Sequence, residues 1–315
     1  MGRIAVTGSV AFDNIMVFPG RFGEHILPDR THNINVSFLV DQLDKRRGGN
    51  AANIAYTLAL LGEAPLLAAA VGNDFAAFGE VLAGAGVDIS TALHCDDIAT
   101  ATCFITTDLD NNQITAFFPG AMGRAAEIDL RTIADVSHVV VSPDAPDAMA
   151  SHIAEAAEMG AKLIFVPAQQ LPAMGEATLR AGIDAAWLIA GNDYEFELIR
   201  SRTGRSVADL CAAGTVVCVT TGHEGSAIHT VDGIAHIPVA PPGNVVDPTG
   251  AGDAYVAGLL AGVRRGLPWP EAGRMGALAA TYVIEQNGTQ SHHFTAAEFH
   301  IRYRAAFNAE LATPG

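Results

Sequence analysis

The fold class is decided by the stretch HVVVSPDAPDAMASHIAEAAEMGAKLIFV, residues 138–166. Short apolar runs at 138–142 and 162–166 flank a segment at 147–159 whose apolar residues have helical spacing. Buried parallel strands are nearly continuous apolar runs, and a crossover helix joins one to the next. The alternation continues with strands at 185–190 and 215–220 around a helix at 193–202. The pattern predicts an α/β fold, a doubly wound and mostly parallel sheet flanked by helices.

The remaining segments complete one predicted α/β domain, residues 1–315. We expect strands at 3–8 and 66–71, a hairpin at 227–230 and 234–237, and helices at 50–61, from Asn73-Asp74 through Leu82, at 251–265, 270–285 and 296–309. Two insertions, at about 14–47 and 94–120, are predicted to contain exposed strands, because 33–38 alternates and 101–118 carries a turn at Asp110-Asn111-Asn112. We expect the insertions to form one small β lid and, through its exposed sheet edge, a homodimer.

Composition excludes several classes of protein. The chain has 18 Lys and Arg against 34 Asp and Glu, a net charge of −16, which argues against nucleic-acid binding and against a polybasic membrane surface. Lys45 and Lys162 are its only lysines, and neither follows a glycine-rich loop, so a Walker A phosphate loop is excluded and a protein-kinase fold is disfavoured. Phosphate would have to be held mainly by backbone N–H groups, helix N-termini and metal ions.

The cysteines and the hydropathy indicate the compartment. Four cysteines without a C-x-x-C spacing are expected to be reduced thiols, and a zinc site is not expected. The N-terminus does not resemble a signal peptide, and no apolar run approaches the ~20 residues of a membrane span. We therefore expect a cytoplasmic protein.

The most informative loop is Asp247-Pro248-Thr249-Gly250-Ala251-Gly252-Asp253, at the start of a predicted helix. Small residues let the backbone approach a ligand, and the unpaired N–H groups of a first helical turn attract an anion. An ionised Asp253 beside them is placed to accept a proton from a hydroxyl while the N–H groups stabilise charge on a transferring group. A helix start with a purely structural Asp is the alternative.

A second loop, Arg47-Gly48-Gly49-Asn50-Ala51-Ala52-Asn53, opens another predicted helix. Its glycine pair allows close approach of a ligand, and Asn53 offers both a donor and an acceptor to a sugar diol. A turn followed by a helix-capping Asn is the alternative.

Taken together, GGNAAN and DPTGAGD, about 200 residues apart, resemble the two signatures of the ribokinase-like (PfkB) carbohydrate kinase family. Three further matches lie in the same order along the chain: Thr7-Gly8-Ser9 with Asp13, the N-x-x-E motif Asn192-Asp193-Tyr194-Glu195, and the T-x-G-x-x-G motif at 220–225. The resemblance covers nearly the whole chain. It implies ATP-dependent phosphorylation of a primary hydroxyl, a reaction in which positioning and charge neutralisation do most of the work.

The resemblance also implies roles for individual residues. Asp253 is the general base, which we expect the helix N-terminus to keep ionised, and Gly250, Ala251 and Gly252 form the anion hole. The substrate is held by Ser9, Asp13, Gly49 and Asn53. Mg²⁺ and its waters are organised by Asn192 and Glu195, ATP is bound by Asn192, Thr220, Gly222, Gly225 and Asn287, and K⁺, as in some relatives, by Asp247 and Thr249. The lid would exclude water.

Within the family the chain looks most like bacterial nucleoside kinases of the adenosine-kinase type, through its segments 18–22, 27–28, 37–41, 117–122, 169–170 and 192–195. A nucleobase needs a flat apolar slot, to which Phe104, Phe117 or Phe118 would contribute by stacking, with Ser37 and Gln170 as polar contacts. Two departures concern the substrate: Cys103 stands where a stacking Phe is expected, and Val166 where a polar residue is expected. The predicted substrate is adenosine or another nucleoside, phosphorylated at its 5′-hydroxyl.

Three alternatives remain. A free sugar such as ribose or fructose is the alternative substrate. A catalytically silent ligand-binding protein on the same scaffold would be favoured by a damaged catalytic loop, but DPTGAGD is intact. A dinucleotide-dependent oxidoreductase would need a G-x-G-x-x-G after the first strand, which this chain lacks.

Overall fold

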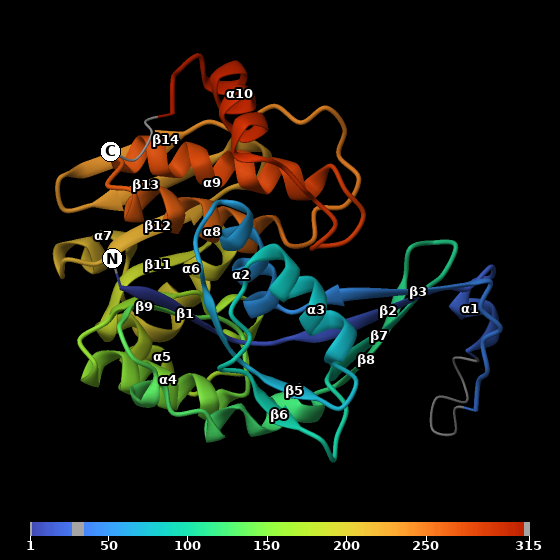
Figure 1. Ribbon diagram of the computed structural model, residues 1–315. Helices are drawn as coiled ribbons and strands as arrows, with labels where there is room; N and C mark the ends of the chain where they lie inside the picture. The colour runs from blue at the N-terminus through green and yellow to red at the C-terminus, as the bar shows by residue number, and fades with distance from the viewer. Residues whose placement is uncertain (1, 27–34, 312–315) are drawn as a thin grey trace.

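An eight-stranded sheet runs through the body of the protein (Figure 1). The structure is a computed structural model, and it describes residues 2–26 and 35–311. The six strands from β4 to β12 pair in parallel, and β13 and β14 add an antiparallel hairpin at one edge. The strand order is β14-β13-β12-β11-β10-β9-β1-β4, with bounds β1 Arg3–Thr7, β4 Leu66–Ala68, β9 Val136–Val141, β10 Lys162–Phe165, β11 Ala186–Asn192, β12 Val216–Thr220, β13 Ser226–Thr230 and β14 Gly233–Ile237.

Helices cover both faces of this sheet, as the predicted doubly wound fold requires. Alternate residues of a strand point to opposite faces, so Ile164 joins one apolar cluster while Leu163 and Phe165 join the other. The first cluster includes residues of α2 Asn50–Leu60, α3 Ala76–Ala85, α8 Ala251–Arg264, α9 Trp269–Ile284 and α10 Ala296–Phe307. The second includes residues of α4 Pro146–Glu158, α5 Glu176–Ala185, α6 Asp193–Thr203 and α7 Val207–Ala212.

A separate four-stranded sheet projects from the body and is drawn at the right of Figure 1. Its order is β3-β2-β7-β8, with bounds β2 Ala11–Val17, β3 Gln42–Gly48, β7 Ala101–Thr107 and β8 Gln113–Phe118. These strands come from the two segments expected to form the lid, and we call this sheet the lid sheet. A short helix, α1 Phe22–His25, lies at its outer end, and a small sheet pairs β5 Ala70–Gly72 with β6 Leu93–Cys95.

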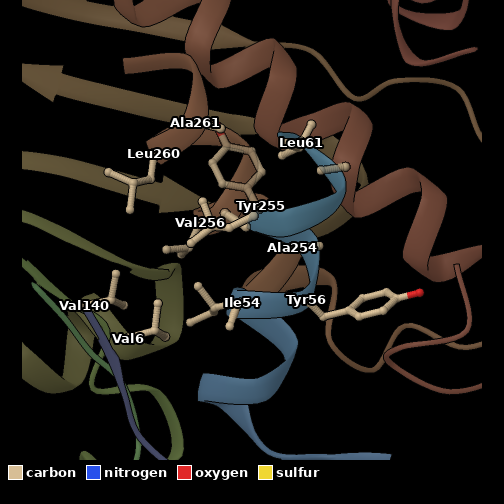
Figure 2. Packing of buried hydrophobic residues seen from close by; sticks show 14 of the residues in the cluster. Val6, Ile54, Tyr56, Leu61, Val140, Ala254, Tyr255, Val256, Leu260 and Ala261 are labelled. Atoms are coloured by element: carbon tan, nitrogen blue, oxygen red, sulfur yellow. The ribbon is translucent and has the colours of Figure 1, made fainter. Parts of the chain in front are cut away.

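The helices α2 and α8 pack against each other, and α2 also contacts β1 and β4 of the large sheet. Figure 2 shows Ile54 of α2 beside Val256 of α8 and close to Val6 and Val140, which point up from β1 and β9. These four side chains are buried, and each buried aliphatic side chain contributes about 1.5–3 kcal/mol. This apolar contact brings α2 and α8 together although 200 residues separate Asn53 from Asp253.

Some local expectations differ from the structure. The strand expected at 66–71 is interrupted at Ala69, because β4 pairs with β1 while β5 leaves to pair with β6. Asp74 does not cap α3; its carboxylate accepts the backbone N–H of Thr100. Of the strand expected at 33–38, residues 35–38 have no regular structure and 33–34 lie outside the described residues, as do Leu27 and Pro28 of the resemblance; β3 pairs with β2 instead.

Candidate active site

The candidate site lies where the N-termini of α2 and α8 meet. Each helix follows a glycine in a left-handed or otherwise unusual conformation: Gly49 has φ 93° and Gly250 has φ 81°. A Cβ on Gly49 would lie 2.5 Å from the carbonyl oxygen of Ser9, and one on Gly250 would lie 2.8 Å from Cγ2 of Thr289. Both glycines are therefore required by backbone conformation and by close packing against Ser9 and Thr289.

Asp253 lies in the first turn of α8 and is held by two side-chain amides of α2. Asn50 Nδ2 donates to its Oδ1 at 2.9 Å, and Asn53 Nδ2 donates to its Oδ2 at 2.8 Å. Each carboxylate oxygen keeps a second lone pair for a substrate hydroxyl. The side chain is only 8% exposed, yet it lines a cavity of about 170 Å³. The carboxylate is thus oriented, nearly dry and open to a small ligand.

The pKa of Asp253 is raised from 3.8 to about 6. Burial is the main cause, the two asparagine donors oppose it, and the negative charge of Glu195 adds to it. We expected the helix N-terminus to keep this group ionised; burial raises its pKa because the cost of burying the charge exceeds the stabilisation from the asparagine donors, but not far enough to neutralise it at pH 7. A carboxylate with a pKa near 6 is a stronger base than an exposed aspartate and is still mostly ionised at neutral pH.

The predicted substrate loop lies against the start of α2. Ser9 Oγ accepts a hydrogen bond from the backbone N–H of Asn50 at 3.1 Å. Ser9, which is predicted to bind the substrate, therefore also satisfies a donor at the start of α2. The Asp13 carboxylate lies over Gly48, where a Cβ would come within 2.5 Å of its Oδ2. Burial raises the pKa of Asp13, Arg46 opposes the rise and Asp247 adds to it. Asp13 therefore lies within electrostatic range of the loop that contains Asp253.

Asn53 is only 6% exposed, and both ends of its amide have protein partners. Its Nδ2 donates to Asp253, and its Oδ1 accepts from Gln290 Nε2 at 2.8 Å. A sugar diol was expected to use this amide. In the structure its first role is to hold the carboxylate of Asp253.

Asp247 and Thr249, the residues implied for K⁺, form a turn in which the Thr249 N–H donates to Asp247 Oδ1 at 3.0 Å. The other oxygen, Oδ2, accepts from Arg46 Nη1 and from the Gly288 N–H, each at 3.4 Å. Although burial opposes ionisation, the hydrogen bonds from Thr249 and Gly288 and the Arg46 charge hold the pKa of Asp247 below its usual value. The Arg46 guanidinium, which also donates from Nε to Asp44 at 2.6 Å, therefore places a positive charge beside this carboxylate.

Asn192 and Glu195, the residues implied for Mg²⁺, form a capping box at the start of α6. Asn192 Oδ1 accepts the Glu195 N–H at 2.8 Å, and Glu195 Oε2 accepts the Asn192 N–H at 3.0 Å. Burial raises the pKa of Glu195, and the hydrogen bond from the Asn192 backbone opposes that rise. Both residues line the cavity that also contains Asp253, Gly250, Gly252 and Thr220. The motif therefore starts a helix and also faces the site.

Among residues 2–26 and 35–311, no group of three or more His, Cys, Asp or Glu could hold a metal ion by itself. Mg²⁺ binds through oxygen ligands and keeps several waters, and it is commonly completed by substrate phosphates. Asn192 and Glu195 fit such water-mediated binding because both residues line the cavity and carry side-chain oxygens that can accept from bound waters. These residues would therefore hold the ion only together with a phosphate-bearing ligand.

The other residues implied for ATP do not all gather here. Thr220 ends β12 and lines the cavity, while Gly222 and Gly225 form the turn that follows, in which the Thr221 N–H donates to the Gly225 carbonyl. Asn287 does not line this cavity. It lines a different one, of about 190 Å³, with neighbours Asp44, Lys45, Arg46, Arg47, Gly288, Gln290 and Ser291. Its segment follows α9 and packs beside the root of the lid sheet, and its role in ATP binding stays a prediction.

The predicted base-stacking residues lie on opposite faces of the lid sheet. Residues paired across neighbouring strands share a face, so Phe117, paired with Cys103, lies on the Asp13 face. Phe104 pairs with Asn14 and lies on the other face. The prediction for Phe104 is therefore corrected by the strand register. Ser37 lies in an exposed segment without regular structure beyond β2.

Three site residues carry no role in the sequence analysis. Asn50 is one turn of helix before Asn53, and this spacing of three, which places both amides on one face of α2, was the available signal. Gln169 Nε2 donates to Asn50 Oδ1 at 2.7 Å, whereas the predicted Gln170 donates to the Asp144 carbonyl. Gln290 reaches Asn53 across 237 positions of sequence, and no local signal could have found it.

A search for membrane-spanning segments found no helix long and apolar enough to cross a bilayer among the described residues. All four cysteines are unpaired thiols.

Comparison with known proteins agrees with this geometry. The family model of the pfkB family carbohydrate kinases matches residues 9–295. A nucleoside kinase of Methanothermobacter thermautotrophicus is 30% identical over 312 residues, covering 98% of this chain and 97% of the relative. The solved structure of Burkholderia thailandensis nucleoside kinase in complex with inosine has a TM-score of 0.88 and 38% identity, covering 98% of this chain and 100% of that chain.

A second structure of that Burkholderia enzyme, with ADP and inosine, has a TM-score of 0.85 and 40% identity, covering 98% of this chain and 97% of that chain. The chain shares the ribokinase-like fold with these proteins, and its own two glycine loops meet around one carboxylate. The chain belongs to the pfkB family of carbohydrate kinases and is a phosphotransferase with an alcohol acceptor.

Proposed function

We propose that the protein is an ATP-dependent nucleoside kinase that transfers the γ-phosphoryl group of ATP to the 5′-hydroxyl of a nucleoside, with adenosine as the first candidate. The observation that carries the proposal is the Asp253 carboxylate, oriented by Asn50 and Asn53 beside the N-terminus of α8 and exposed to a small cavity. The relatives named nucleoside kinases, and the Burkholderia structure with inosine, support a nucleoside as the acceptor.

In this proposal, Asp253 accepts the proton of the 5′-hydroxyl as the new oxygen–phosphorus bond forms. The backbone N–H groups from Gly250 to Gly252 open α8, where a transferring phosphoryl group meets unpaired donors and the positive end of the helix dipole. A Cβ on Gly252 would meet nothing within 4 Å, which leaves room for that group. When bound, Mg²⁺ would supply neutralisation of phosphate charge, held through waters by Asn192 and Glu195.

For the nucleoside, Asp13 and Gly49 supply polar contacts and Phe117 an aromatic surface, all on or beside the Asp13 face of the lid sheet. Closure of this sheet over the site would exclude water, which protects ATP from hydrolysis. Gln170 is fixed by the Asp144 carbonyl and leaves its own carbonyl oxygen for a base edge. The unpaired thiols fit a reducing compartment, and we propose a cytoplasmic location.

The implied K⁺ site fits the residues less well. A cation at Asp247 would compete with the Arg46 guanidinium, 3.4 Å from its Oδ2. We propose that Arg46 supplies the positive charge that some relatives take from K⁺.

The central test measures ADP release from ATP and Mg²⁺ with adenosine, inosine, ribose and fructose as acceptors. We expect turnover with the purine nucleosides and loss of it in Asp253→Asn. The matched control is Asp232→Asn, in the exposed turn between β13 and β14. Turnover only with the free sugars would show that the acceptor is a sugar and not a nucleoside. Full turnover in Asp253→Asn would remove this residue as the base.

We also propose that a second copy of the chain packs on the lid sheet. The face opposite Asp13 presents four exposed apolar side chains, Leu43, Phe104, Ile114 and Phe118, which are 43–67% exposed. These side chains share one face because each pairs, directly or through a neighbouring strand, with Phe12, Asn14 or Met16, which alternate along β2. A contiguous apolar face of this kind favours association.

The oligomer is tested by light scattering of the intact protein. We expect a mass near twice the 32.7 kDa of one chain, and about half that mass for Phe118→Lys. Val231→Lys, which alters an exposed apolar residue in the β13–β14 turn, should leave the mass unchanged. A monomeric parent protein would contradict the proposal.

A further inference from the structure

A buried chain of side-chain amides leads from Gln290 to the Asp253 carboxylate. Gln290 Nε2 donates to Asn53 Oδ1 at 2.8 Å, and Asn53 Nδ2 donates to Asp253 Oδ2 at 2.8 Å. Gln290, Asn53 and Asp253 are 3%, 6% and 8% exposed, so water has little access to replace either bond. Each link therefore depends on the one before it.

An asparagine amide has a donor end and an acceptor end of nearly the same size. Asn53 can present either end to Asp253, and the two choices have opposite consequences. When Nδ2 points toward Asp253, Asn53 donates to the carboxylate and stabilises its ionised form. When Oδ1 points toward Asp253, the amide oxygen repels the ionised carboxylate. Gln290 presents Nε2 at this contact and so favours one choice, because a donor there is accepted by Asn53 Oδ1 while Nδ2 faces Asp253.

The Gln290 side chain is poorly suited to a purely stabilising role. Its Oε1 is buried and has no hydrogen-bond partner among residues 2–26 and 35–311. A buried carbonyl without a partner destabilises the folded protein, whereas an apolar side chain of the same length would not. The donor end of Gln290 is thus the part that its surroundings use.

We propose that Gln290 is a positioning residue that fixes the amide of Asn53 with its donor toward Asp253, and thereby keeps the general base ionised at neutral pH. The inference rests on the proposed role of Asp253 as the base. It assigns no contact with substrate to Gln290. A second arm, from Gln169 to Asn50, has the same form, but Gln169 is exposed and water can replace it.

The groups that surround Asp253 allow the effect of Gln290 on its ionisation to be measured. The α2 side of the carboxylate presents the neutral amides of Asn50 and Asn53, and the segment after α9 presents Gln290. Glu195 on α6 is the charged group that acts on it, and its own helix adds the N-terminal dipole. A neutral substitution at position 290 changes neither of these charges.

The test is the pH dependence of kcat/KM for the nucleoside, measured from pH 5 to 9 in Gln290→Met and in the parent. Methionine keeps the length and removes the donor. We expect the acid limb to move to higher pH by about one unit, with activity at pH 9 recovering to within about threefold of the parent. Gln286→Met, an exposed glutamine at the end of α9, is the matched control and should leave the limb in place.

An acid limb that stays within about 0.2 pH unit of the parent, whatever the overall rate, would overturn the proposal. If Gln290→Met does not fold, Gln290→Leu carries the same test, because leucine is also neutral and has no donor for Asn53 Oδ1. Full activity in Asp253→Asn would instead show that Asp253 is not the general base. This result differs from an unchanged acid limb in Gln290→Met, so the two proposals can fail separately.

A double-mutant cycle gives a second readout. If Gln290 acts through Asn53, adding Gln290→Met to Asn53→Leu should shift the acid limb no further than Asn53→Leu alone. Additive shifts would contradict the relay and leave Gln290 a direct electrostatic or structural role.

Discussion

Replacing Asp253 by asparagine removes a buried negative charge and a general base in one step. The pKa of this carboxyl rises from 3.8 to about 6 in the folded protein, a difference of about two pH units. At 1.36 kcal/mol per unit, the ionised group therefore costs the folded state about 3 kcal/mol at neutral pH. The neutral variant is spared this cost but can satisfy only one of the two asparagine donors with its single carbonyl. We expect a net gain in stability of about 1–3 kcal/mol.

The sign of the pH dependence follows from the raised pKa. Between pH 3.8 and about 6 the folded parent holds a proton that the unfolded chain has lost, so its stability falls as the pH rises through this window. Asparagine does not titrate. The stability difference should therefore be full at pH 8 and shrink to about a third at pH 4.5.

The assay is urea unfolding of the parent and of Asp253→Asn at pH 4.5, 6 and 8, together with kinase turnover at pH 8. Turnover should fall by about 10²–10⁴-fold, the usual contribution of a general base. A variant no more stable than the parent at pH 8, or a stability difference that does not change with pH, would refute the reasoning about charge burial. Asp232→Asn serves as the control for both measurements.

Three further predictions address the loops around this group. Gly49→Ala should abolish nucleoside binding measured by calorimetry and lower the melting temperature, because the new Cβ would lie 2.5 Å from the Ser9 carbonyl oxygen at a φ of 93°; normal binding would contradict this. Arg46→Ala should make turnover rise when KCl replaces choline chloride, whereas the parent should respond little; a strongly K⁺-dependent parent would show that Arg46 does not replace the cation. Tyr255→Phe should cost about 1 kcal/mol in urea unfolding, since its hydroxyl bonds a buried serine at 2.6 Å; an unchanged midpoint would show that this bond contributes no net stability.

Local patterns predicted more of the fold than of the site. The βα alternation predicted the sheet and its two helical layers, and the α6 start was readable because Asn192 and Glu195 form a capping box within four residues. Where the chain departed from these patterns, a distant partner was the reason. β5 leaves the large sheet for β6, and Asp74 bonds Thr100 instead of capping α3.

The site residues also divide into those that local sequence patterns predict and those that distant contacts decide. The glycines at 49 and 250 and the acid at 253 are recognisable from the two loops, because each loop opens its own helix and carries its own conformational requirement. The strand register decided that Phe117 shares the Asp13 face and Phe104 does not, and a shift of one residue reverses this assignment.

By itself the sequence determined the fold class, the two helix-opening loops and the carboxylate beside one of them, since these depend on neighbours a few residues apart. Only the tertiary structure decided that two asparagines of α2 hold Asp253, that its pKa rises instead of falling, and that Gln290 stands behind Asn53. Burial and long-range hydrogen bonds arise when α2, α8 and the segment after α9 pack together, and no single stretch of sequence contains that information.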